Sequence, residues 1–274
     1  MLEISPDKKG KVTVKNLTVI YQGRQNTTAV EDLNFEVKPG EFVCLLGTSG
    51  CGKTTILNVI SGFIKPIKGE VFLDGQAILE PGPERGIVFQ QDALFPWKTV
   101  IGNVEFGPKM KGNNKKNRRE IADKYIKLVG LSGFEKSYPA ELSGGMKQRV
   151  EIARVLINDP TVLLMDEPFG SLDAQTRMMM QELLLDIWEK YHKTVIFVTH
   201  DVDEAIFLAD RILVLTTRPG QVKKEILVNL PRPRNYNIMV SHSFIKIKEE
   251  VMKLIREETI KAINLSTKTK SRIV

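Results

Sequence analysis

The alternation of apolar and polar positions divides the chain into an N-terminal antiparallel section and a following α/β core. β-branched residues alternate with polar ones over residues 12–21 and 34–37, which predicts the two strands of an antiparallel hairpin. Residues 40–47 end in a continuous apolar run typical of a buried strand, a glycine-rich loop follows, and residues 54–63 have a helical period. This order of strand, loop and helix is how a parallel α/β sheet begins.

Further apolar runs predict additional strands of the core. They span residues 69–74, 86–90, 161–166, 194–199 and 211–216. Between the second and the third of these runs, residues 93–158 have helical periods interrupted by glycines and no convincing strand. We therefore expect a helical subdomain inserted into the α/β core.

The pattern changes again after residue 217, where a possible short strand and a proline-stiffened linker precede an amphipathic helix over residues 241–262. Ser241 or Ser243 is placed to cap that helix. The pattern predicts a first domain of residues 1–217 and a C-terminal extension of residues 218–274. We expect the helix to pack on the core or on a second copy of the chain, with solute sensing as the alternative.

Composition limits the class of protein. Hydrophobic residues make up 42% of the chain, which supports a sizeable packed core, and no uninterrupted apolar run reaches the length of a membrane span. The first residues lack the apolar core of a secretory signal. We therefore expect a compact soluble protein that works at a membrane only through a partner.

The net charge of +7 suits a nucleic-acid surface, an anionic membrane surface or a solvated exterior. Many of the basic residues crowd into residues 109–119 without interleaved aromatic residues, which favours a solvated helix face. Cys44 and Cys51 lie in a predicted strand and in the loop after it, so we expect reduced thiols and no disulfide. The histidines have no metal-ligand spacing near either cysteine.

The glycine-rich loop fits the pattern G-x-x-x-x-G-K-[ST], whose backbone N–H groups close around the phosphates of a nucleotide. Lys53 would reach the β- and γ-phosphates, and the hydroxyl of Thr54 would bind Mg²⁺. The N-terminus of the following helix adds a favourable dipole for the anion. The residues expected to bind the nucleotide here are Gly47, Ser49, Gly50, Cys51, Gly52, Lys53, Thr54 and Thr55.

Two carboxylates, Asp166 and Glu167, follow four apolar residues at the end of a predicted buried strand. Ligands bind at such strand ends in open α/β sheets. Asp166 is then placed to hold the Mg²⁺ shell, and Glu167 to accept a proton from the attacking water. A solvated acidic turn is the alternative, and the phosphate loop argues against it.

The segment Leu142–Arg149, LSGGMKQR, resembles the LSGGQ signature of ABC ATPases, with Met146 in place of the usual glutamine. Ser143 can cap the helix that follows and direct the helix dipole at a phosphate. The resemblance implies that Ser143, Gly144 and Gly145 bind the γ-phosphate held by a second copy of the chain.

The remaining elements of that family occur in the expected order. The resemblance implies that Tyr21 stacks on adenine, that Gln90 senses Mg²⁺ and the γ-phosphate, that Asp173 lies in a loop at the dimer contact, and that His200 is the switch histidine. Taken singly, a tyrosine at a strand end packs and a histidine after a strand caps a turn. Gln91 beside Gln90 leaves an ambiguity of one residue, which we resolve toward Gln90.

The resemblance therefore implies a P-loop NTPase fold of the ABC ATPase type, with an N-terminal antiparallel β subdomain and the inserted helical subdomain. It also implies ATP hydrolysis at two composite sites in a homodimer that sandwiches the nucleotides. The implied catalytic residues are Lys53, Gln90, Glu167 and His200. The implied Mg²⁺ ligands are Thr54, Gln90 and Asp166.

Spacing separates the classes of ABC ATPase. Lys53 and Ser143 are 90 residues apart, which leaves no room for the coiled coil of DNA-maintenance relatives. Translation-type relatives pair two cassettes in one chain, whereas this chain has one. A small-molecule kinase has no need of a water-activating Glu167. These points favour a transporter subunit without a nucleic-acid partner, and the basic charge keeps a nucleic-acid role as the minor alternative.

Four runs resemble the ATPases of nitrate, sulfonate and taurine importers: residues 89–107, 166–177, 216–222 and 230–234. Related ATPases serve thiamine-precursor pyrimidines and bicarbonate. The resemblance implies import of a small solute through a separate permease, with a solute-binding protein as an indirect partner, at the cytoplasmic face of the membrane. An exporter with a separate permease is the alternative. Residues 93–97 offer an apolar surface for docking of the permease or for ordinary packing.

Overall fold

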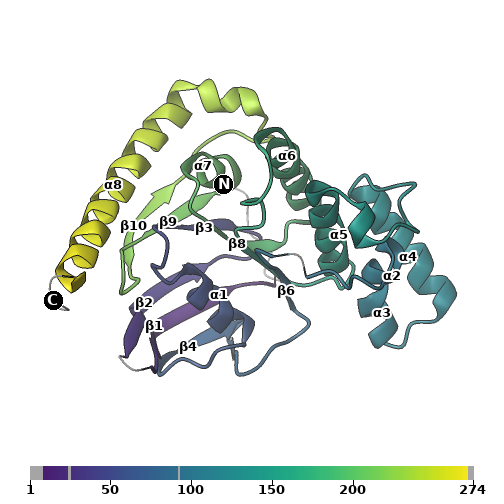
Figure 1. The fold of residues 1–274 in the computed structure, drawn as a ribbon, viewed down its shortest axis with the longest axis horizontal. Coiled ribbons are helices and arrows are strands. Elements are labelled where there is room, and N and C mark those ends of the chain that lie inside the picture. The colour runs from purple at the N-terminus through teal and green to yellow at the C-terminus, as the bar shows by residue number, and fades with distance from the viewer. Residues whose placement is uncertain (1–8, 24–25, 92, 271–274) are drawn as a thin grey trace. The chain divides into compact units, whose positions relative to one another are not determined.

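The computed structural model describes residues 9–23, 26–91 and 93–270 of the chain (Figure 1). It consists of two compact units. The first unit combines residues 1–82 with residues 192–274, and the second unit is formed by residues 83–191. No helix in the described part of the chain is long and apolar enough to cross a membrane.

The first unit contains an antiparallel sheet with the strand order β2-β1-β4-β5. Its strands are β1 (Val12–Tyr21), β2 (Thr27–Val37), β4 (Lys68–Leu73) and β5 (Gln76–Ala77). The predicted hairpin is confirmed, but β2 starts well before residue 34. Its register shifts against β1 near Leu17 and Val19, and Asp32 has a positive φ of 47°, so the alternation expected of a regular strand is interrupted there.

The placement of β4 corrects a prediction. Residues 69–74 were expected in the α/β core, yet β4 pairs antiparallel with β1, with Val14 opposite Val71. A short apolar run is compatible with either kind of sheet. The deciding feature is the tight turn at Asp74 and Gly75, both with positive φ, which folds β4 back on β5.

The second sheet of this unit has the strand order β10-β9-β3-β8. The strands are β3 (Phe42–Leu46), β8 (Thr194–Thr199), β9 (Arg211–Leu215) and β10 (Val222–Leu227). β3 pairs parallel with β8 and with β9, and β10 is antiparallel to β9. Every residue of β3 and β8 is buried, as their unbroken apolar runs predict for parallel strands covered on both faces.

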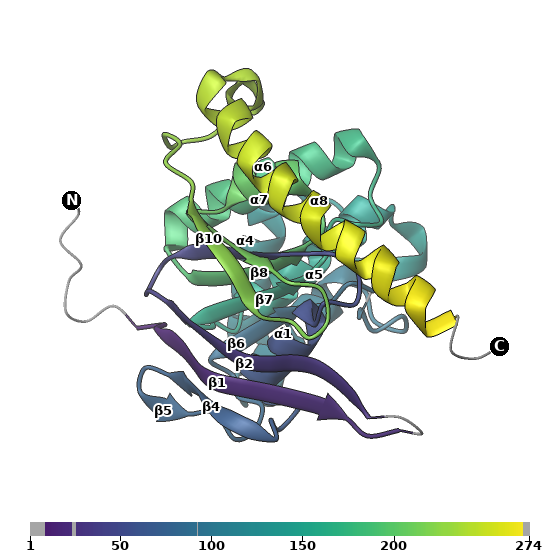
Figure 2. The same ribbon diagram turned by 90° about the vertical axis from the view of Figure 1, so that its left-hand side faces the viewer.

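Four helical segments complete the first unit: α1 (Lys53–Ser61), α7 (Val202–Leu208), η2 (Tyr236–Val240) and α8 (His242–Lys270). α1 contacts β8, and α7 contacts β3 and β8. Ser241 caps α8 as predicted, because its Oγ accepts a hydrogen bond of 3.2 Å from the N–H of Phe244. α8 continues past residue 262, where no proline or glycine stops it. Figure 2 shows α8 passing along the β9–β10 hairpin.

The second unit joins two parallel strands to a group of helices. Its elements are β6 (Arg85–Val88), α2 (Val100–Val104), α3 (Phe106–Met110), α4 (Lys115–Leu128), η1 (Pro139–Glu141), α5 (Gly144–Leu156), β7 (Val162–Asp166) and α6 (Ala174–Tyr191). Within residues 93–158 the described chain is helical and has no strand, as predicted. Helices α2, α4 and α5 pack on one another (Figure 1).

Candidate nucleotide-binding site

The glycine-rich loop connects β3 to α1 in the first unit. Gly50 and Gly52 have φ values of +77° and +101°, a backbone conformation that favours glycine. A Cβ at Gly52 would also lie 2.8 Å from the carbonyl oxygen of Ala29. Gly52 is the N-cap of α1, and no described side chain caps that helix. Its first-turn N–H groups therefore suit an anion.

Lys53 fits a site for phosphate. Its Nζ donates to the carbonyl oxygens of Gly47 at 2.9 Å and Thr48 at 3.2 Å, so the ammonium group lies against the loop. The residue is only 5% exposed. The buried Oγ1 of Thr48 has no hydrogen-bond partner within the described chain. A buried ammonium group and an unpaired hydroxyl in a glycine-rich loop are groups that phosphate oxygens can satisfy.

Tyr21 lies at the end of β1 and reaches the same loop–helix segment. Its hydroxyl is 3.1 Å from Oγ1 of Thr55 in α1. The side chain keeps its ring accessible, with 44% of the residue exposed. An accessible aromatic ring beside a phosphate loop is suited to stacking against a base.

Strand register places His200 at the same sheet edge as the phosphate loop. Leu46 of β3 pairs with Thr199 of β8, so Gly47 and His200 both leave the sheet at the next position. His200 is exposed and is followed by Asp201, whose carboxylate caps α7 by accepting from the N–H of Glu204 at 3.0 Å. The cap fixes the backbone next to His200.

The second unit holds the acidic strand end. Val88 of β6 pairs with Met165 of β7, so Gln90 and Glu167 leave their strands at equivalent positions of one edge. Asp166 is the last residue of β7 and is 9% exposed. Glu167 has a positive φ of 44°, which costs about 1–3 kcal/mol for a residue with a side chain. Such strain is concentrated at functional sites.

The signature segment begins α5 in the same unit. Oγ of Ser143 accepts a hydrogen bond of 3.3 Å from the N–H of Met146, which confirms the predicted cap. A Cβ at Gly145 would lie 2.4 Å from Cγ2 of Thr176, so the start of α5 packs closely on the start of α6. Asp173 caps α6 by accepting from the N–H of Thr176 at 3.0 Å, and this hydrogen bond lowers the pKa of Asp173.

The predicted site residues thus form two sets, one in each unit. The first unit holds Tyr21, Gly47, Ser49, Gly50, Cys51, Gly52, Lys53, Thr54, Thr55 and His200. The second unit holds Gln90, Ser143, Gly144, Gly145, Asp166, Glu167 and Asp173. The expected Mg²⁺ ligands, Thr54, Gln90 and Asp166, offer only oxygen donors, which suits a hard cation. Cys44 and Cys51 are buried and form no disulfide, which agrees with the expected reduced thiols.

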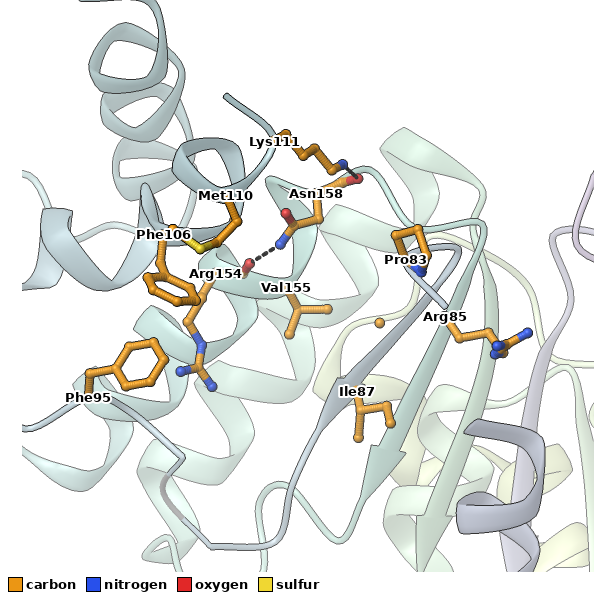
Figure 3. Close-up of a pocket in the computed structure, with 12 residues that line it drawn as sticks. Pro83, Arg85, Ile87, Phe95, Phe106, Met110, Lys111, Arg154, Val155 and Asn158 are labelled. Atoms are coloured by element: carbon orange, nitrogen blue, oxygen red, sulfur yellow. Dashed lines mark hydrogen bonds between the residues drawn. The ribbon is translucent and has the colours of Figure 1, made fainter. Parts of the chain in front are cut away.

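A groove of about 480 Å³ lies in the second unit between β6, α3 and α5 (Figure 3). Arg154 crosses its wall, where the guanidinium carbon is 5.5 Å from the centroid of the Phe95 ring and Nη1 donates to the carbonyl of Ala93 at 2.7 Å. Burial lowers the pKa of Arg154. Leu94 is buried while Trp97 is 71% exposed, so the predicted apolar surface is partly packed and partly free.

Sequence reasoning missed several residues around these sites. Phe106 and Met110 line the groove from α3, and nothing in their local pattern marks them. Arg218 lies beside the phosphate loop, where its Nε donates to the carbonyl of Gly50 at 3.3 Å. Arg218 belongs to a run noted only for its resemblance to importer ATPases, and that run carries no sign of this contact.

A glycine-rich phosphate loop connects a buried parallel strand to a helix, Asp166 and Glu167 lie at the end of β7, and α5 begins with Gly144 and Gly145. This combination defines a P-loop ATPase. A family model described as ABC transporter matches residues 30–170. The chain belongs to the ABC transporter family, and it is an ABC-type ATPase.

Its relatives include proteins of transport systems. An uncharacterized ABC transporter ATP-binding protein of Methanocaldococcus jannaschii is 50% identical over 93% of this chain and 95% of its own length. A nitrate import ATP-binding protein of Synechocystis is 46% identical over 89% of this chain and 94% of its own. An aliphatic sulfonates import ATP-binding protein of Bacillus cereus is 45% identical over 88% of this chain and 94% of its own length.

A dimeric ATP-binding cassette, solved in a post-hydrolysis state with ADP and Pi bound, has the same fold with a TM-score of 0.70. It is 35% identical to this chain and covers 80% of it, and all of the solved chain is matched. The predicted ABC ATPase fold is thereby confirmed.

Proposed function

We propose that the chain is the ATP-hydrolysing subunit of an importer, and that it works through a separate permease at the cytoplasmic face of the membrane. The observation that carries this proposal is the similarity to nitrate and sulfonate import ATP-binding proteins over 94% of their length. The solute is a small anion such as nitrate, a sulfonate or taurine. A solute-binding protein delivers it to the permease and has no direct contact with this chain.

The working form is a homodimer that sandwiches ATP. Each site combines the phosphate loop, Gln90, Glu167 and His200 of one copy with Ser143 and Gly145 of the other. The capped N-terminus of α5 supports this arrangement, because its dipole suits a phosphate. The similarity to a dimeric cassette solved with ADP and Pi supports it further.

The chemistry follows from the residue types. Lys53 and the loop N–H groups hold the β- and γ-phosphates, and the ring of Tyr21 stacks on adenine. Glu167 accepts the proton of the attacking water, while His200 contacts the γ-phosphate. Thr54, Gln90 and Asp166 would hold Mg²⁺, whose charge would offset the negative charge of the phosphates.

The groove in the second unit receives a cytoplasmic segment of the permease. Its wall is apolar and aromatic, with Phe95, Phe106 and Met110 around the half-buried guanidinium of Arg154. Aromatic and methionine side chains are favoured at the centre of protein interfaces, as are arginines. Met110 is 63% exposed at this groove, as expected of a side chain that a partner covers.

The import function is tested by co-purifying the chain with its permease, reconstituting both in liposomes, and adding the solute-binding protein with nitrate, a sulfonate or taurine. We expect one of these solutes to stimulate phosphate release, and Glu167→Gln to abolish that release. ATP hydrolysis that none of the three stimulates would contradict the proposed solute class.

The docking surface is tested with Met110→Glu, which places a charge in the groove at an exposed position. We expect the variant to lose co-purification with the permease and to keep ATP binding. Met179→Glu is the matched control, because Met179 is 46% exposed on α6 and does not line the groove. If both variants lose co-purification with the permease to the same extent, or if both keep it, the groove is not the docking site.

A further inference from the structure

The turn between β9 and β10, residues 216–220, packs directly on the elements that carry the phosphate loop. The N–H of Gly220 donates to the carbonyl of Ala29 at 2.9 Å, and the N–H of Glu31 donates to the carbonyl of Gly220 at 3.3 Å. A Cβ at Gly220 would lie 2.2 Å from the carbonyl oxygen of Cys51. The turn backbone therefore touches both β2 and the phosphate loop, with no space for a side chain between them.

A second contact joins the same turn to the loop. Nε of Arg218 donates to the carbonyl of Gly50 at 3.3 Å, next to the left-handed backbone of Gly50 itself. The turn is closed internally, because Oγ1 of Thr216 donates to the carbonyl of Pro219 at 2.8 Å and the N–H of Thr216 donates to Gln221 at 2.9 Å. A displacement of the turn is therefore passed to the phosphate loop at two places.

The turn is held from the other side by Glu258 of α8. Oε2 of Glu258 accepts a hydrogen bond of 2.8 Å from the N–H of Thr217, the residue before Arg218. Oε1 accepts from Nζ of Lys223 at 2.8 Å and from Nζ of Lys261 at 2.9 Å. The side chain of Glu258 is 0% exposed.

A carboxylate buried to this degree is tolerated only when its oxygens are satisfied, and here two ammonium groups and one backbone N–H satisfy them. Anchoring α8 requires only an ion pair, and Lys224–Glu250 already supplies one at the surface. The contact that anchoring does not require is the hydrogen bond from the Thr217 backbone. That contact links the helix to the turn that touches the phosphate loop.

We propose that Glu258 is a positioning residue for ATP binding, which acts through the 216–220 turn and Arg218 on the shape of the phosphate loop. α8 therefore helps to hold the phosphate loop in the conformation that binds the nucleotide. A partner that moves α8 changes the affinity of the chain for ATP.

The test compares Glu258→Gln with Glu257→Gln in the full chain, and the readout is the equilibrium affinity for ATP from titration with a fluorescent analogue. Glu257 is a matched control, because it also binds Lys223, at 2.7 Å, but its side chain is 48% exposed and it has no contact with Thr217 among the hydrogen bonds of the described residues. We expect Glu258→Gln to weaken ATP binding about fivefold or more and Glu257→Gln to change it by less than about twofold.

Steady-state kinetics separate positioning from simple loss of fold. We expect Glu258→Gln to raise KM for ATP while kcat stays close to that of the wild type. A folded Glu258→Gln variant that binds ATP within about twofold of the wild type would overturn the proposal.

Arg218→Ala keeps the inference testable if Glu258→Gln does not fold, because it leaves the buried carboxylate and its lysines in place. We expect Arg218→Ala alone to weaken ATP binding. We also expect the double variant Arg218→Ala/Glu258→Gln to lose less ATP affinity than the product of the two single fold-changes. If the fold-change in ATP affinity of the double variant equals the product of the two single fold-changes, Glu258 does not act through the turn. Unchanged affinity in Arg218→Ala would count equally against the proposal.

Discussion

Replacing Lys53 by methionine removes the ammonium group from the phosphate loop and keeps a side chain of similar length. In the structure Nζ of Lys53 lies 2.9 Å from the carbonyl oxygen of Gly47 and 3.2 Å from that of Thr48. These carbonyls hold the ammonium group against the glycine-rich loop. We expect the same ammonium group to bind the phosphates of ATP.

The size of the effect follows from the strength of hydrogen bonds to charged groups. A hydrogen bond to a charged group contributes about 1.5–3 kcal/mol. Since about 1.4 kcal/mol is a factor of ten in affinity, Lys53→Met should weaken ATP binding roughly 10- to 150-fold. The loop carbonyls also lose a donor, but the methionine fills the volume of the stem. We therefore expect stability to fall by only about 1 kcal/mol.

Titration with a fluorescent ATP analogue measures the affinity, and a thermal melt measures the change in stability. Lys68→Met is the control, because Lys68 is an exposed lysine of β4 in the same unit. We expect the control to bind ATP as the wild type does. A folded Lys53→Met variant with ATP affinity within about threefold of the wild type would refute the assignment of Lys53 to the phosphates.

Three further predictions follow from the geometry. Burial raises the pKa of Glu258, but its hydrogen-bond donors outweigh burial and bring the pKa from 4.5 to about 2. Glu258 therefore contributes roughly 3 kcal/mol of stability above pH 4.5, and the contribution is lost as the pH falls toward 2. The difference in unfolding free energy between wild type and Glu258→Gln should narrow as the pH falls from 4.5 toward 2. A difference that stays constant with pH would contradict the lowered pKa of Glu258. Burial also raises the pKa of the Cys44 thiol, so iodoacetamide should label Cys44 in unfolded but not in folded protein, as mass spectrometry can check. Finally, the unfolding free energy of Gly145→Ala should be about 1–3 kcal/mol lower than that of Gly144→Ala, because the Cβ at position 145 would lie 2.4 Å from Cγ2 of Thr176 in α6. Equal unfolding free energies would contradict close packing of α5 on α6.

Local patterns were sufficient to predict the phosphate loop, the cap at Ser143 and most strands. In each case the signal lies within a few neighbouring residues, as for Gly52 and Lys53, where backbone conformation and charge follow from residue type. The parallel core strands carried unbroken apolar runs because both of their faces are buried. β4 was placed in the wrong sheet, since its partner is chosen by long-range pairing that a short run does not encode.

The contacts that sequence reasoning missed are long-range ones. Glu257 and Glu258 are adjacent and chemically identical, yet their side chains are 48% and 0% exposed. Only the packing of α8 against the β9–β10 hairpin distinguishes them. The groove has the same origin, because Phe95, Met110 and Arg154 meet in space without any motif in common.

We propose that two copies of this chain enclose ATP between the phosphate loop of one copy and the N-terminus of α5 of the other. Glu167→Gln should bind ATP without hydrolysing it and so keep the closed dimer. Light scattering coupled to size exclusion, with the purified variant in ATP and Mg²⁺, measures its mass directly. We expect a dimer with ATP and a monomer without it, and a variant that binds ATP but remains monomeric would contradict the proposed dimer.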